Sequence, residues 1–191
     1  IQSVFPECGQ ITYNIPVDII LCDCPPLETN PATVPLCALN DMLDLSALLE
    51  EGGAGAWSIT DEPPGFNPAT LTGSLFTTNM SDPGAYTVTY TLNSPEPGCP
   101  SSSSEVIMVS AVVEPDAGPD VAFCGPQVVM LDGSITPLGP YTIVWETLGD
   151  GVFADVNSPV TTYTPGPLDS IAPGLYLVLN VLDPVCGNQS D

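Results

Sequence analysis

Apolar and polar residues alternate along several short stretches of the chain, as they do in β-strands that bury one face. The clearest run spans residues 86–92, Tyr-Thr-Val-Thr-Tyr-Thr-Leu. Other runs rich in branched and aromatic residues lie at 56–59, 128–131, 141–146, 161–164 and 175–182. Glycine- and proline-rich turns separate them, for example at 52–55, 132–133 and 165–167. Short strands separated by frequent turns predict an all-β, antiparallel sandwich.

Residues 42–49 fit two interpretations. Their leucines recur with a partly helical period, which allows a short helix. The matching run in the second half of the chain, 128–133, has the composition of a strand. We therefore favour a strand at both places.

The chain contains an internal repeat. Two cysteines enclose a tryptophan and a tyrosine in each copy, and the two cysteine pairs have identical spacing. The tyrosines follow matching Pro-Gly-x sequences. The repeated residues are Cys37, Trp57, Tyr86 and Cys99 in the first copy, and Cys124, Trp145, Tyr176 and Cys186 in the second.

This repeat predicts two domains and part of a third. Residues 25–114 form the first repeat and 115–191 the second, while 1–24 resemble the closing strands of a preceding repeat plus a proline-rich link. A β-prone run follows Cys8 and Cys99, and none follows Cys186, so we expect the second repeat to lack its last strand. Either the sequence is a window of a longer array, or another chain supplies that strand by strand addition.

The aromatic residues of the repeat have a structural interpretation. Trp57 and Trp145 keep nearly the same offset from the first cysteine, so we expect both to fill the core between two sheets. A role in stacking on a sugar ring is the less favoured alternative. Tyr86 and Tyr176 are expected to bury their rings and bond the backbone through their hydroxyls.

Cysteine usage indicates an oxidising compartment. The chain has seven cysteines and no histidine, so mixed Cys/His zinc sites are excluded. The equal spacing predicts the disulfides Cys37–Cys99 and Cys124–Cys186. Three cysteines remain unassigned, and bridging within or between chains is favoured over redox activity for them: Cys8, Cys22 and Cys24.

The charge balance narrows the function classes. The chain has 23 acidic residues and no lysine, arginine or histidine, for a net charge of −23. Such a chain repels nucleic acids and anionic membranes, and it lacks the usual general bases and oxyanion donors of enzymes. It attracts cations, and Glu114, Asp116 and Asp120 at the junction of the repeats are candidate Ca²⁺ ligands. The alternative is a plain solvated turn, with no cofactor.

The second repeat resembles the Ig-like, PKD-like repeats of giant surface proteins of Bacteroidetes, including gliding-motility adhesins. The matching residues are Asp116-Ala117-Gly118-Pro119-Asp120, the run 129–134, Trp145, 162–165, 173–176 and 184–187. This resemblance implies tandem Ig-like sandwiches, secretion to the cell surface through the type IX pathway, and a stalk, fibre or adhesive role. It also implies O-glycosylation at Ser170, within Asp-Ser-Ile. Asn79, within Asn-Met-Ser, fits the N-linked pattern.

Two functions from different classes follow. The favoured one is a structural repeat segment of a long extracellular fibre, stalk or sheath, whose partners are other copies or repeats of the same protein. The alternative is an adhesin module that binds a surface polysaccharide, with or without Ca²⁺. No run of about 18 apolar residues is present, so we expect no membrane insertion.

Overall fold

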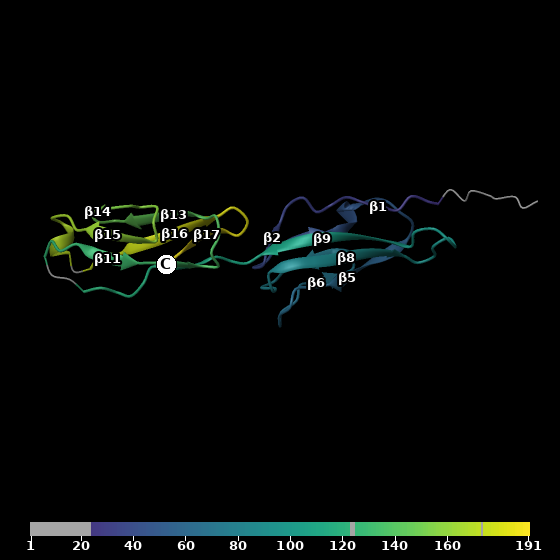
Figure 1. Ribbon diagram of the computed structural model, residues 1–191, viewed down its shortest axis with the longest axis horizontal. Coiled ribbons are helices and arrows are strands. Elements are labelled where there is room, and N and C mark those ends of the chain that lie inside the picture. The colour runs from purple at the N-terminus through teal and green to yellow at the C-terminus, as the bar shows by residue number, and fades with distance from the viewer. Residues whose placement is uncertain (1–23, 123–124, 173) are drawn as a thin grey trace, which may run out of the picture.

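A computed structural model describes residues 24–122, 125–172 and 174–191. Two β-sandwiches lie end to end along the long axis of the molecule (Figure 1). The described part of the chain contains no α-helix, only the short 3-10 helices η1 (Leu45–Ala47) and η2 (Asp169–Ile171). None of its helices is long and apolar enough to cross a membrane. The predicted all-β, tandem Ig-like sandwich fold is confirmed.

The first sandwich contains a four-stranded sheet of order β2-β9-β8-β5 and a three-stranded sheet of order β3-β7-β6. A short pair, β1 with β4, lies beside them. All pairs are antiparallel except β2 with β9, which is parallel. The strands are β1 (Glu28–Thr29), β2 (Leu36–Cys37), β3 (Met42–Asp44), β4 (Leu49–Glu51), β5 (Gly55–Asp61), β6 (Thr70–Thr72), β7 (Leu75–Thr77), β8 (Gly84–Leu92) and β9 (Ser102–Ser110).

The core of the first sandwich lies between these two sheets. On β8, Tyr86, Val88 and Tyr90 are buried, as the alternating sequence predicts. Tyr86 buries its ring against Phe76 and donates its hydroxyl proton to the Asp82 carbonyl, so its predicted role is confirmed.

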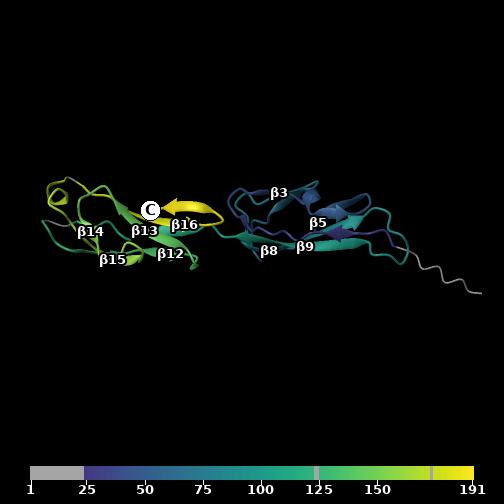
Figure 2. The ribbon, with the colours of Figure 1, turned by 90° about the horizontal axis from the view of Figure 1, so that it is seen from above.

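The second sandwich repeats this plan with fewer paired residues. One sheet has the order β11-β15-β14 and the other β13-β16-β17, and a separate pair, β10 with β12, lies toward the first sandwich. Figure 2 shows the two layers from above. The strands are β10 (Glu114–Asp116), β11 (Val129–Asp132), β12 (Ser134–Thr136), β13 (Thr142–Thr147), β14 (Val152–Phe153), β15 (Val160–Thr164), β16 (Leu177–Asp183) and β17 (Gly187–Ser190).

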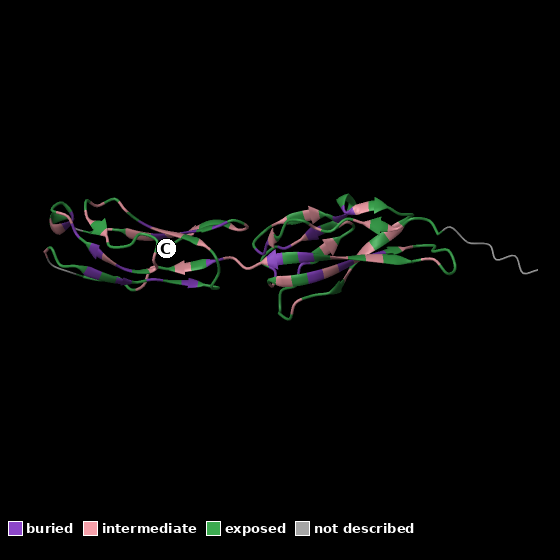
Figure 3. Ribbon diagram, turned by 45° about the horizontal axis from the view of Figure 1, so that its top comes forward, coloured by how far each residue is buried: buried purple, intermediate pink, exposed green. Residues whose placement is uncertain are grey.

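Trp145 lies in the core of the second sandwich, with Leu179 and Tyr163 as buried neighbours. Its side chain is 2% exposed, and its indole N–H donates to the Ser158 carbonyl. Trp57 is only partly buried, but it contacts the core of the first sandwich on β5. Both tryptophans therefore fill cores, as predicted. Burial along both sandwiches is shown in Figure 3.

Of three local expectations, one was right only in part and two were wrong. Residues 42–44 form the favoured strand, but Leu45–Ala47 form η1, because the Asp44 side chain accepts from the Ser46 amide and caps a 3-10 turn. Tyr176 is 82% exposed, since Leu175 and Leu177 take the inward positions beside it.

The third expectation concerned the end of the second repeat. A strand does follow Cys186: β17 pairs antiparallel with β16, from Asn180 opposite Ser190 to Asp183 opposite Gly187. Its polar sequence escaped a pattern based on apolar residues, because main-chain hydrogen bonds suffice for a strand at a sheet edge.

Candidate functional site at the joint between the sandwiches

A short linker joins the sandwiches, and both of its ends are anchored. The last strand of the first sandwich ends at Ser110, whose carbonyl accepts from the Ala38 amide at 2.9 Å. Val113 is 1% exposed and belongs to a small cluster with Ile135 and Val181 of the second sandwich. Only Ala111 and Val112 therefore lie between the two folded units.

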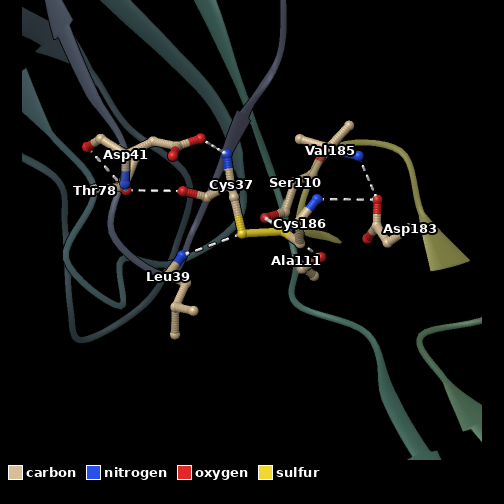
Figure 4. Close-up of a disulfide and its surroundings, with 9 residues drawn as sticks. All are labelled: Cys37, Leu39, Asp41, Thr78, Ser110, Ala111, Asp183, Val185 and Cys186. Carbon is tan, nitrogen blue, oxygen red and sulfur yellow. Dashed lines mark hydrogen bonds between the residues drawn. A yellow bond between two sulfur atoms is a disulfide. The ribbon is translucent and has the colours of Figure 1, made fainter. Parts of the chain in front are cut away.

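A disulfide crosses this joint. Cys37, at the end of β2, bonds to Cys186, in the turn between β16 and β17, with the Cα atoms 5.0 Å apart. Figure 4 shows the bond beside the linker, where Sγ of Cys186 lies 3.6 Å from the Ala111 carbonyl oxygen. The two sandwiches are thus connected twice, once by the backbone and once by the disulfide.

The first sandwich holds Cys37 through its main chain. The Cys37 amide donates to the Asp41 carboxylate at 2.6 Å, and its carbonyl accepts from the Thr78 hydroxyl at 2.8 Å. Thr78 is 1% exposed and Cys37 is 5% exposed, so this half of the disulfide is shielded from solvent.

The second sandwich holds Cys186 in a tight turn. The buried Asp183 carboxylate accepts from the amides of Val185 and Cys186, at 2.7 and 3.2 Å. No side chain of this protein is basic, so backbone amides are the donors that satisfy this buried carboxylate. Both cysteines are therefore presented by preorganised backbone.

The predicted pairing Cys37–Cys99 was wrong. Cys99 bonds to Cys24, with the Cα atoms 5.4 Å apart. Cys37 lies level with Ser110, the last residue of β9, whereas Cys99 precedes the first residue of that strand. A nine-residue strand is roughly 30 Å long, far beyond the reach of a disulfide.

The pairing Cys124–Cys186 was also wrong, since Cys186 bonds to Cys37. Cys124 itself, with Cys8 and Cys22, lies outside the described residues. Cys24, which the sequence left unassigned, closes the first sandwich at the end farther from the joint. In the sequence, Cys24 is marked only by its position beside the proline-rich link, and that position does not identify the cysteine to which it bonds.

A cavity of about 460 Å³ lies at the joint. Leu39, Met80 and Pro83 of the first sandwich line it, together with Val112 of the linker and Gln189 of the second sandwich. The cavity shows that side chains do not fill the joint completely. Beside this cavity, the disulfide and the anchored linker connect the two units.

A second hollow, also of about 460 Å³, opens between the sheets of the second sandwich. Core residues line it, including Val129, Leu131, Trp145 and Leu177. In the first sandwich, β9 continues along the sheet and buries Ile107 and Val109 in the core. β17 has the sequence Gly-Asn-Gln-Ser and places no apolar side chain there.

A hydrogen-bonded cluster holds the loops at the far end of the second sandwich. The Asp169 carboxylate accepts from the Tyr163 hydroxyl at 2.6 Å and from the Gly166 and Asp150 amides. The bond from Tyr163 lowers the pKa of Asp169 below its usual value, and burial raises the pKa of Tyr163. The lowered pKa keeps Asp169 ionised, and its carboxylate holds the surrounding loops together through these hydrogen bonds.

The candidate calcium ligands are not brought together. Glu114 and Asp116 lie on the exposed face of β10, where Asp116 accepts from the Gly118 amide, and Asp120 lies at the hollow of the second sandwich. Within residues 24–122, 125–172 and 174–191, no three acidic, cysteine or histidine side chains form a group that could hold a metal ion.

The two candidate glycosylation residues differ in their surroundings. Asn79 is exposed in the loop after β7, with a positive φ of 35°. Ser170 is half-buried in η2, and its hydroxyl donates to the Gly166 carbonyl at 3.0 Å. Asn79 is therefore open to an attached glycan, whereas Ser170 would first have to give up its hydrogen bond.

No known protein family and no curated protein matches this chain. An I-band fragment of titin is similar to it at 12% identity, with a TM-score of 0.48, over 88% of this chain and 63% of that one. A three-Ig titin structure with Glu-to-Ala changes is similar at 13% identity, with a TM-score of 0.41 and the same coverage. The chain thus spans less than two thirds of either fragment.

These likenesses add nothing to the tandem β-sandwich architecture that the strand pairing already establishes. They give no support to the resemblance to Bacteroidetes surface repeats, which rests on the sequence motifs alone.

Proposed function

We propose that this chain is a structural segment of a long extracellular surface protein, such as a fibre, stalk or sheath, and that it sets a fixed geometry between successive sandwiches. The observation that carries this proposal is the disulfide Cys37–Cys186, which connects two domains across a linker of very few residues. Disulfides of this kind persist in oxidising surroundings outside the cytoplasm.

The charge of the chain fits the same role. The 23 acidic residues have no basic partner, so neighbouring molecules carry like charge. This repulsion opposes non-specific aggregation and keeps an elongated protein soluble. The same charge makes the two acidic sandwiches repel each other, and the cavity at the joint interrupts the packing that would oppose this repulsion. A covalent link beside the linker removes that freedom.

Small-angle X-ray scattering tests the fixed joint. We expect the oxidised chain to give a narrow distribution of shapes, and the double variant Cys37→Ser, Cys186→Ser to give a broader one with a lower average end-to-end distance. The double variant Cys24→Ser, Cys99→Ser is the matched control, because it removes a disulfide that lies within the first sandwich. Identical scattering from the oxidised chain and the joint variant would contradict the proposal.

We further propose that the second sandwich accepts an extended strand in its hollow, between β11 and the start of β16. The hollow is lined by core residues, and its counterpart in the first sandwich is filled by the apolar side chains of β9. A strand with alternating apolar residues would pair with β16 near Leu177, beyond the residues that β17 pairs, and cover Trp145. Assembly by strand addition would follow if the strand came from another copy.

A peptide with the sequence of β9 tests this docking. We expect it to bind a Trp57→Phe chain and to change the fluorescence of Trp145, because Ile107 and Val109 of the peptide enter the hollow. A control peptide with serine at those two positions is expected not to bind. Equal responses to the two peptides, or no response to either, would rule out strand addition at this place.

The adhesive alternative has no comparable observation in its favour. Among the residues that the structure describes, the large exposed aromatic side chains, Phe66 and Tyr176, lie on different sandwiches and form no common platform.

A further inference from the structure

The disulfides determine which parts of the chain bear a pulling force. Consider a load that enters before Cys24 and leaves after Cys186, as it would in a surface fibre. The bond Cys37–Cys186 closes a loop with a sequence separation of 149 residues. All strands from β3 to β16 lie inside that loop. Force passes across the disulfide and bypasses them.

The segments left outside the loop are short and lie at its two ends. Before Cys37 are β1 and β2, and after Cys186 is β17. β2 runs parallel to β9, with Leu36 opposite Val109 and Cys37 opposite Ser110, and it ends directly at the bonded cysteine. A load along β2 therefore reaches the sulfur without first crossing either core.

The surroundings of the Cys37–Cys186 disulfide restrict access to it. Cys37 is almost fully buried, and Cys186 is half-buried with its Sγ against the Ala111 carbonyl. The Asp41 and Asp183 carboxylates accept from the amides of Cys37 and Cys186, and the Thr78 hydroxyl donates to the Cys37 carbonyl, so the segments on both sides are fixed. Reducing agents in solution thus have limited access to the bond that carries the load.

The second disulfide, Cys24–Cys99, would shield part of the chain from force if the first bond were absent. Cys24–Cys99 encloses most of the first sandwich, with a sequence separation of 75 residues, but none of the second. If Cys37–Cys186 were absent, force would cross from Cys24 to Cys99 and then run through the linker and the second sandwich. The two bonds therefore have unequal mechanical roles, although each closes a loop.

We propose that Cys37–Cys186 takes both sandwiches out of the load path, so that this segment is a tether that cannot lengthen by unfolding. The inference rests on the proposed structural function and adds the property that such a segment would contribute. It differs from a simple string of sandwiches, in which each domain lies in series with the load and extends when it unfolds.

Single-molecule stretching of the oxidised 191-residue chain between its two ends tests the inference. We expect no extension beyond that of the segments outside the loop. The variant Cys37→Ser, Cys186→Ser should stretch about 25 nm farther, because the chain after Cys99 is released at roughly 3.3–3.6 Å per residue. Replacing all four bonded cysteines should add about 50 nm relative to the oxidised chain, the length of the whole loop.

The variant Cys24→Ser, Cys99→Ser is the control, and it should stretch no farther than the oxidised chain. These lengths do not depend on whether a variant folds well, provided that peptide mapping confirms the remaining disulfide. An oxidised chain that stretches as far as the joint variant would overturn the inference. If scattering shows a rigid joint but the oxidised chain extends under load, only this inference is overturned. If scattering shows a mobile joint but the oxidised chain does not extend under load, only the proposed fixed geometry is overturned.

Discussion

Replacing Trp145 with alanine is expected to destabilise the second sandwich by about 3–5 kcal/mol. The indole is 2% exposed, stacks near Phe153 with ring centroids 6.0 Å apart, and donates to the Ser158 carbonyl. The hollow beside it already leaves part of this core without close neighbours. The truncation would enlarge that space, and the small domain has few other large side chains to compensate. We expect its strands to lose most of their protection from amide hydrogen exchange.

Hydrogen exchange followed by mass spectrometry measures this effect for each sandwich separately. Peptides from β13 and β16 should exchange much faster in the variant, while those from β5 and β8 should change little. Trp57→Ala is the matched control, and it should cost less because Trp57 is only partly buried. Equal losses from the two variants would mean that burial of the indole does not govern the stability of these domains.

The strands were largely predictable from the sequence because their signal is local. The alternating run 86–92 corresponds to β8, and the run that contains Trp57 corresponds to β5. Alternation arises from the two faces of a single strand, so it can be recognised without knowing which strand is next to it. β17 was missed for the same reason, since a polar edge strand has no apolar face to reveal it.

The predicted equivalence of Tyr86 and Tyr176 was wrong by one residue position. In the structure Trp57 lies opposite Tyr90, and Trp145 lies opposite Leu179. Counting back along each strand places Leu175, not Tyr176, in the position equivalent to Tyr86. Because side chains alternate between faces, a shift of one residue turns an inward position into an exposed one.

The disulfides could not be predicted from spacing because equal spacing reflects duplication, whereas bonding requires proximity. Cys99 and Cys186 occupy corresponding hairpin turns, yet they bond to different kinds of partner: Cys24 in the segment before its own sandwich, and Cys37 in the neighbouring sandwich. The candidate site at the joint depends on how two domains meet. No pattern within either repeat contains that information.

Removing the disulfide Cys24–Cys99 by serine substitution is expected to destabilise the first sandwich by about 4 kcal/mol, from the entropy of a loop of this length in the unfolded chain. The loop encloses most of the strands of that sandwich, so its opening affects nearly the whole unit. Cys37–Cys186 still closes a longer loop, which limits the entropy that the unfolded chain regains. The measured loss should therefore fall at or below this value.

Urea denaturation of the oxidised protein and of the Cys24→Ser, Cys99→Ser variant measures the difference. Trp57 fluorescence in a Trp145→Phe background follows the first sandwich, and Trp145 fluorescence in a Trp57→Phe background follows the second. The midpoint should fall markedly for the first sandwich and little for the second, which that disulfide does not enclose. A Thr78→Ser variant, which keeps the hydroxyl that binds the Cys37 carbonyl, controls for small changes at a buried site in the same sandwich. If the cysteine variant unfolded at the same urea concentration as the oxidised chain, Cys24–Cys99 would contribute no stability, and the closure of the first sandwich would rest on its apolar core between β8 and β7.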